Sequence, residues 1–168
     1  MSHSYVFVVK EKNKKDEWDN FKTDEDTLVD DFRHAMDYAT ELEPYEYQEL
    51  VTMIVTYFSS VCGAENVIYT KANRFKLTRA GIEQYFIRLR DEVQDFLRDS
   101  QSRPLSQWIS NGLHGWWYLK DMIESPYEWY WKLEDSCPMP TTSFLQDLYT
   151  LGKEEYELEL IQAFDYHC

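Results

Sequence analysis

The residues best suited to chemistry stand in a short glycine-containing stretch beyond the middle of the chain. His114 lies between Gly112 and Gly115 and is followed directly by Trp116 and Trp117. A histidine on such a turn, beneath a wall of indole rings, could act as the general base of a small hydrolase or transferase. Histidines in turns between helices are more often structural, so we keep this enzyme interpretation as an alternative.

Other reactive side chains lack partners at a useful spacing. Adjacent carboxylates are plentiful, but they serve acid–base or metal chemistry only inside a dry pocket. Cys137 has no histidine near it in sequence to activate its thiol, and His3 could meet His167 and Cys168 only if the chain ends pair. Glycine-rich phosphate-binding, HExxH, CxxC and GxSxG motifs are also missing from the sequence. We therefore expect no catalytic residue, no metal site and no cofactor.

The region around His114 is rich in aromatic residues. Four tryptophans and three tyrosines fall between residues 116 and 131. One helical stripe cannot bury all four indoles, because neighbours such as Trp116 and Trp117 point about a quarter-turn apart. Each buried indole N–H also needs a partner. We expect most of these rings in the core, Trp116 among them, with Trp117 or Trp129 at the surface.

Carboxylates border these rings. An exposed aromatic ring rimmed by acids is typical of a protein-binding hot spot, where tryptophan and tyrosine dominate the energetics. Acids three or four residues apart on a helix stand about 5–6 Å from one another, comparable to the phosphate spacing of a nucleic-acid strand. Such a field would attract a basic partner. The sequence therefore predicts a partner-binding surface that contains Trp117, Asp121, Glu124, Glu128 and Trp129.

Charge is the strongest compositional signal. The 168 residues carry a net charge of −14, with 31 acidic residues against 17 lysines and arginines. Residues 16–46 hold 12 acids and two bases, residues 71–103 hold eight bases and five acids, and the remainder is again acidic. Direct nucleic-acid binding is disfavoured, because phosphate binding needs clustered lysine and arginine. Disorder is disfavoured as well, since 17% of the residues are aromatic.

The acidic segment 24–46 shows a helical pattern. Leu28, Phe32, Ala35, Ala39 and Leu42 fall on one face. Because these residues claim the buried side, the acids of the segment should point outward. We therefore add four carboxylates to the predicted partner-binding surface: Asp30, Asp31, Asp37 and Glu41.

The other elements follow from local signals. Residues 4–10 and 156–166 alternate or are β-branched and predict strands that pair in one sheet. A helix is expected to end at Gly63, a hairpin spans residues 67–77, and a long helix begins at Thr78 with an apolar face that runs to Leu97. Shorter helices are expected over residues 105–109, 116–123, 127–133 and 144–151. The prediction is an α+β fold, one domain over residues 1–168, with helices on one side of a small sheet.

Composition also bears on location. No apolar run approaches 18 residues, and the first residues lack the pattern of a signal peptide. Three cysteines at no motif spacing are typical of reduced thiols. We expect a cytoplasmic protein that contacts no membrane.

These observations favour a non-enzymatic acidic inhibitor. It would bind a basic surface of a partner protein, such as a nuclease or another nucleic-acid-binding protein, as a nucleic-acid mimic of the anti-restriction or anti-CRISPR type. An immunity protein that neutralises a basic toxin would use the same physics. The alternative of another class is the hydrolase or transferase with a pocket near His114.

Overall fold

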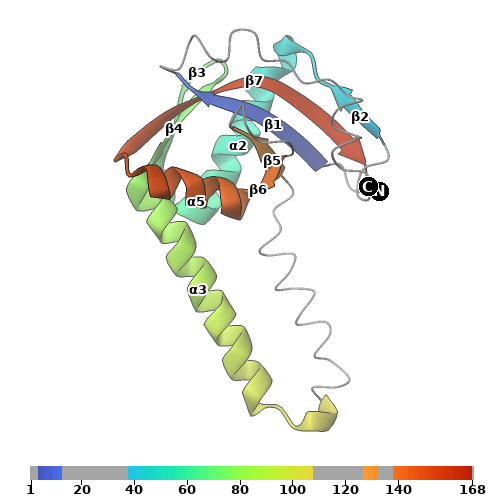
Figure 1. Ribbon diagram of the computed structural model, residues 1–168, viewed down its shortest axis with the longest axis vertical. Coiled ribbons are helices and arrows are strands. Elements are labelled where there is room, and N and C mark those ends of the chain that lie inside the picture. Colours follow the sequence, from blue (N-terminus) through green and yellow to red (C-terminus); the bar gives the residue numbers. More distant parts are fainter. Residues whose placement is uncertain (1–3, 13–37, 108–126, 132–137, 168) are drawn as a thin grey trace.

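The strand patterns at the two chain ends form the centre of one sheet. The computed structural model describes residues 4–12, 38–107, 127–131 and 138–167. In it, β7 (Glu155–His167) runs antiparallel to β1 (Ser4–Glu11) from one end of β1 to the other. Figure 1 shows both strands arching over the helices. This pairing confirms the terminal-strand prediction and, with it, the α+β fold class.

Five further strands complete the sheet. On the side of β7 away from β1 lie β4 (Arg74–Thr78) and β2 (Tyr38–Glu41), both antiparallel to β7. The hairpin partner of β4 is β3 (Val67–Lys71). On the other side of β1, β5 (Tyr127–Tyr130) pairs in parallel and β6 (Met139–Pro140) follows it. The strand order is β3-β4-β7-β1-β5-β6, with β2 beside the C-terminal part of β7.

A bulge in β7 allows two separate strands to pair along the same side. Val8 lies opposite Gln162 and Val9 opposite Leu160, so Ile161 is an extra residue. Leu160 N donates to Asn73 O, directly before β4, and Ala163 O accepts from Leu42 N, directly after β2. In a regular strand, backbone groups three residues apart point to opposite sides, so the bulge is what turns both toward this edge. The stretch between these two bonds is paired with no strand on that side.

The helices begin and end where local signals place them. A 3-10 turn, η1 (Pro44–Glu46), leads into α2 (Tyr47–Cys62), which ends at Gly63 with φ 89°. After a second short turn, η2 (Ala64–Asn66), and the hairpin, Thr78 Oγ1 accepts from Gly81 N and caps α3 (Arg79–Ser102). The last helix is α5 (Thr141–Leu151). Among the described helices, none combines the length and apolar character needed to cross a bilayer.

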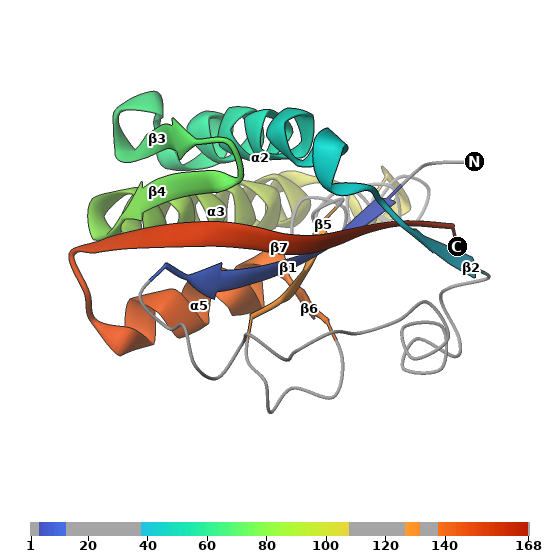
Figure 2. The same ribbon diagram turned by 90° about the horizontal axis from the view of Figure 1, so that it is seen from above.

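The main core lies between the sheet and the helices. Figures 1 and 2 show α2 and α5 packed beside the β1–β7 pair, with α3 running alongside α2. Phe58 of α2, Trp129 of β5 and Phe144 of α5 are fully buried there. A smaller cluster of buried residues occupies the opposite face of the sheet, as the alternation of β1 requires: Val6, Val8, Ala39, Tyr130, Phe164 and Tyr166.

Two predicted helices are contradicted over the residues that the structure describes. Tyr38–Glu41 is strand β2, and the predicted helix 28–42 therefore does not include its last turn; its earlier residues lie outside the described part of the chain. Residues 127–130 form strand β5 where a helix over 127–133 was expected. In both cases the deciding interactions are hydrogen bonds to strands distant in sequence, β7 for β2 and β1 for β5.

The apolar face predicted for α3 is only partly used. Its buried residues are confined to the first two turns, at Gly81, Ile82 and Tyr85. Farther along, Leu97 is 51% exposed. A helix of 24 residues is about 36 Å long, and its second half extends beyond the sheet (Figure 1).

Candidate protein-binding surface

Most residues of the predicted partner-binding surface lie outside the described residues. This applies to Asp30, Asp31, Asp37, Trp117, Asp121 and Glu124, and also to His114 of the enzyme alternative. Three predicted residues are described: Glu41 on β2, and Glu128 and Trp129 on β5. Trp129 tests the predicted exposure of an aromatic ring, and the two glutamates test whether the predicted carboxylates share one face.

The expected exposure of Trp129 is wrong. Its indole is fully buried, stacked between Phe58 at 5.4 Å and Phe144 at 4.7 Å between ring centroids. Its Nε1 donates to Thr141 Oγ1 at 2.8 Å, which satisfies the only polar atom of the ring. The register of β5 against β1 sets Trp129 beside Phe7, and so on the helix-covered face of the sheet. Trp129 is therefore a core residue and cannot contact a partner.

Glu41 and Glu128 do share one face of the sheet. Glu41 pairs with Phe164, Phe164 with Val6, and Val6 with Glu128, so these four residues form one row across β2, β7, β1 and β5. Three strand spacings separate the two glutamates by about 14 Å. The side chains between them are buried and apolar. Glu41 is exposed and accepts a hydrogen bond from Gln162 Nε2 at 3.0 Å.

Positive charge on the described surface is largely neutralised. In the described residues, every lysine and arginine except Lys10 and Lys71 lies in an ion pair. On the sheet, Arg74 pairs with Glu159 and Lys76 with Glu155, each at 2.9 Å. Four arginines of α3, and Arg103 directly after it, pair with acids of that helix: Arg79–Glu83, Arg88–Glu92, Arg90–Asp91, Arg98–Asp95 and Arg103–Asp99. The basic middle segment seen in the sequence therefore does not form a basic surface.

Negative charge accumulates instead where η1 leads into α2. Four glutamates and an exposed tyrosine fall within nine residues that contain no lysine or arginine. We call this the Tyr45 surface, made of Glu41, Glu43, Tyr45, Glu46 and Glu49. The Tyr45 ring is 82% exposed, the highest value among the large exposed hydrophobic side chains of the described residues.

Glu43, Glu46 and Glu49 of the Tyr45 surface form no ion pair with a described lysine or arginine. Glu46 has a local role, because its carboxylate accepts a hydrogen bond from Glu43 N at 2.9 Å. Glu43 and Glu49 are exposed, and no described lysine or arginine lies within ion-pair distance of either carboxylate. These charges therefore act outward, on solvent or on a partner.

The negative field reaches the neighbouring Tyr47. Burial raises the pKa of the Tyr47 phenol above its ordinary 10.0, and the charges of Glu41 and Glu43 raise it further. The Tyr47 hydroxyl donates to Ile161 O at 3.3 Å, next to the bulge in β7. Tyr47 thus joins the acidic segment to the stretch of β7 that lies between β4 and β2.

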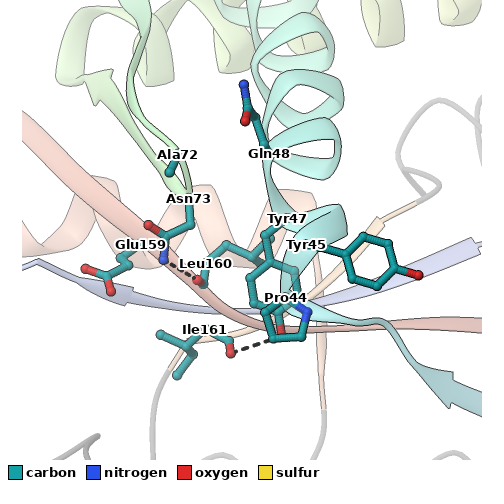
Figure 3. A pocket seen from close by; sticks show the side chains of 9 residues that line it. All are labelled: Pro44, Tyr45, Tyr47, Gln48, Ala72, Asn73, Glu159, Leu160 and Ile161. Carbon is teal, nitrogen blue, oxygen red and sulfur yellow. Dashed lines mark hydrogen bonds between the residues drawn. The ribbon is translucent and has the colours of Figure 1, made fainter.

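A cavity of about 510 Å³ opens at this junction. We call it the β7 groove. Figure 3 shows η1 and α2 on one side of it, the β3–β4 turn at Ala72 and Asn73 on the other, and β7 at the bottom. It is lined by Pro44, Tyr45, Tyr47, Gln48, Ala72, Asn73, Glu159, Leu160 and Ile161.

A second cavity of about 640 Å³ lies between α3 and α5 and differs in charge. Its lining residues are Glu83, Phe86, Ile87, Gln146 and Tyr149. The one carboxylate among its described lining residues, Glu83, is paired with Arg79, whose guanidinium also lies over the Tyr149 ring at 4.4 Å. The described lining is mainly apolar and locally neutral, so it shows no preference for a basic ligand.

The described residues offer little for covalent or metal chemistry. Within those ranges, no three side chains of His, Cys, Asp or Glu come together as metal ligands would. Burial raises the pKa of the Cys62 thiol to about 12, so the nucleophilic thiolate is scarce at neutral pH. The Tyr45 surface and its groove are suited to binding a positively charged group.

Sequence reasoning identified Glu41 but missed the rest of this surface. The signal that could have found it is a run of four glutamates around Tyr45, within residues 41–49, that contains no lysine or arginine. The sequence matches no protein-family model, and no curated protein or solved structure is significantly similar to it.

Proposed function

We propose that this protein is a non-enzymatic, acidic inhibitor that binds a basic surface of a partner protein through the Tyr45 surface. The partner class is a protein with a nucleic-acid-binding cleft, which the inhibitor would occupy as a mimic of the nucleic acid. We place this interaction in the cytoplasm.

The observation that carries the proposal is the uneven pairing of charge. Elsewhere on the described surface, nearly every cation lies beside an acid, so the fields cancel at short range. At the Tyr45 surface, Glu43 and Glu49 face solvent without a cation beside them. Unpaired carboxylates that project from a folded scaffold raise the local potential and speed the encounter with a basic surface.

Tyr45 adds an anchor to this charge. Charged rims set the rate and the salt dependence of association, whereas aromatic residues at the centre supply most of the binding free energy. Tyr45 lies between Glu43 and Glu46 with its ring largely in solvent. An exposed aromatic side chain flanked by carboxylates is expected for a surface that captures a basic partner.

The experiment is capture of host proteins on the immobilised chain at low and at physiological salt, followed by elution with duplex DNA. The proposal predicts that captured proteins are basic, that salt weakens their retention steeply, and that duplex DNA releases them because it competes for the same cleft. The chain itself should not bind duplex DNA at physiological salt. Retention that ignores both salt and DNA would contradict the proposal.

A further inference from the structure

We infer that the β7 groove receives an arginine side chain of the basic partner, with the edge of its guanidinium at the backbone carbonyls of β7 and its face against the tyrosine rings. This inference rests on the proposed function and specifies its binding site. The groove follows from the break in strand pairing between β4 and β2, which leaves residues 160–163 of β7 without a neighbouring strand along that edge.

Hydrogen-bonding capacity in the groove favours a donor-rich ligand. The two side-chain donors at its floor are already used: Asn73 Nδ2 donates to Leu160 O at 3.0 Å, and Tyr47 Oη donates to Ile161 O at 3.3 Å. Each carbonyl oxygen has a second lone pair, and no described donor contacts Asn73 Oδ1. Figure 3 shows these groups with the Glu159 carboxylate around the same opening. The groove therefore offers mainly acceptors, whereas a guanidinium offers five N–H donors and no acceptor.

Charge points to the same ligand. Glu43, Glu46 and Glu49 adjoin the lining residues Pro44, Tyr45 and Gln48 in sequence, and the effect of Glu41 and Glu43 on the pKa of Tyr47 indicates that the field of the Tyr45 surface extends into the groove. Glu159 lies in the lining itself, although Arg74 holds one of its oxygens at 2.9 Å. The described cation without an ion pair on this side, Lys71, lies next to Ala72 on the opposite wall. A cation in the groove would thus be attracted by Glu43 and Glu49 and repelled only from the far side.

The tyrosine rings distinguish arginine from lysine. A planar guanidinium stacks on an aromatic face and is more weakly hydrated than an ammonium, so it loses less when it leaves water. Tyr45 and Tyr47 both line the groove: Tyr45 is exposed, and Tyr47 is buried with its hydroxyl at Ile161 O. A cation over an exposed ring is worth about 0.5–1 kcal/mol, or roughly two- to fivefold in affinity.

The test uses three short peptides of one glycine-rich sequence that carry arginine, lysine or citrulline at the same positions. Each is titrated into the isotopically labelled full chain while the backbone amide signals are followed by NMR. The inference predicts saturable shifts at Gln48, Ala72 and Asn73 with the arginine peptide, binding about two- to fivefold weaker with lysine, and no binding with citrulline. Shifts confined to other residues, or equal binding of citrulline, would overturn it.

Two variants locate the contact. Tyr45→Ala should weaken the arginine peptide about two- to fivefold, and the ring is so exposed that the fold should be unaffected. Tyr149→Ala removes a ring from the second cavity and should leave the affinity for the arginine peptide unchanged. If Tyr45→Ala has no effect on the peptide while Glu43→Gln still weakens capture of the partner, the groove inference fails and the proposed function stands. If neither Tyr45→Ala nor Glu43→Gln affects capture of the partner, the groove inference and the proposed function both fail.

Discussion

Helix α3 and the Tyr45 surface are both highly charged, but they differ in how their charges are arranged. Along α3, arginines and acids alternate at helical spacing, and pairs such as Arg98–Asp95 at 3.2 Å neutralise one another. Over the Tyr45 surface, four glutamates surround one tyrosine with no cation in the segment. The first arrangement makes a soluble helix surface with a weak outward field, whereas the second concentrates negative charge beside an exposed ring and a groove.

The comparison shows why the net charge of −14 is a poor locator of a binding site. A segment with many charged residues contributes to recognition only where the charges lack partners of opposite sign within the molecule. By this criterion we expect α3 to contribute little to recognition, in spite of its four arginines. The Tyr45 surface contributes more, although it has fewer charged residues. Variants can separate these two regions.

The largest expected effect concerns stability and separates a buried aromatic residue, Trp129, from an exposed one, Tyr45. Trp129→Ala removes a ring stacked between Phe58 and Phe144 and should cost about 3–5 kcal/mol of unfolding free energy. Tyr45→Ala removes a ring in solvent and should stay within about 0.5 kcal/mol of the wild type. Chemical denaturation measures both. A large loss for Tyr45→Ala would mean that the ring supports the fold and is not reserved for a partner.

An intermediate effect is expected at the start of α3. Thr78 Oγ1 accepts from Gly81 N at 3.1 Å and donates to Asn66 Oδ1 at 2.8 Å. Thr78→Ala loses both bonds and should cost about 0.5–2 kcal/mol of stability, while Thr78→Ser keeps the hydroxyl and should cost much less. Partner binding by the folded Thr78→Ala variant should be unchanged, since α3 lies outside the proposed surface. Weaker binding at full folding would place α3 in the interface.

A smaller effect concerns the ionisation of Tyr47. Its pKa is raised first by burial and then by Glu41 and Glu43, so Glu43→Gln should lower it toward 10.0 without abolishing the shift. Asp95→Asn on α3 should leave it unchanged. The phenol carbon shift of Tyr47, followed by NMR against pH and assigned with Tyr47→Phe, reports the value. Equal shifts of the Tyr47 pKa in Glu43→Gln and Asp95→Asn would mean that this pKa depends only on the net charge of the protein.

The same shift fixes the sign of a pH effect on stability. The folded state holds the neutral phenol of Tyr47 more tightly than the unfolded chain, whose pKa stays near 10.0. Its stabilising contribution is therefore complete below pH 10 and is lost as pH rises toward the elevated folded value. Tyr47→Phe cannot ionise and should lose less stability over this alkaline range.

Sequence patterns were sufficient where structure depends on neighbouring residues. Gly63 ends α2 and Thr78 caps α3 because these are local backbone events, and the alternation of Tyr156, Leu158 and Leu160 marks a half-buried strand. The pairing of β1 with β7 could be predicted because a strand pattern lies near each end of the sequence. These features could be predicted without knowledge of the rest of the chain.

Patterns were insufficient where distant pairing decides. Residues 127–130 carry aromatic side chains that suit a helix or a strand, and only the parallel register with β1 makes them a strand and buries Trp129 beside Phe7. Tyr38–Glu41 continues an apparent helical stripe, yet β7 offers its far half as a pairing edge because of the bulge at Ile161. The β7 groove arises from that same bulge, which no local signal in the sequence reveals.

The central claim of the proposal is that Glu43 and Glu49 of the Tyr45 surface, and not net charge, bind the partner. Two double variants that remove the same charge test it: Glu43→Gln with Glu49→Gln, and Asp95→Asn with Asp99→Asn on α3. The affinity of each for the captured partner is measured from low to physiological salt. We predict that the first pair loses about 0.5–2 kcal/mol of binding free energy and much of the salt dependence, while the second matches the wild type. Equal losses in both pairs would contradict the claim.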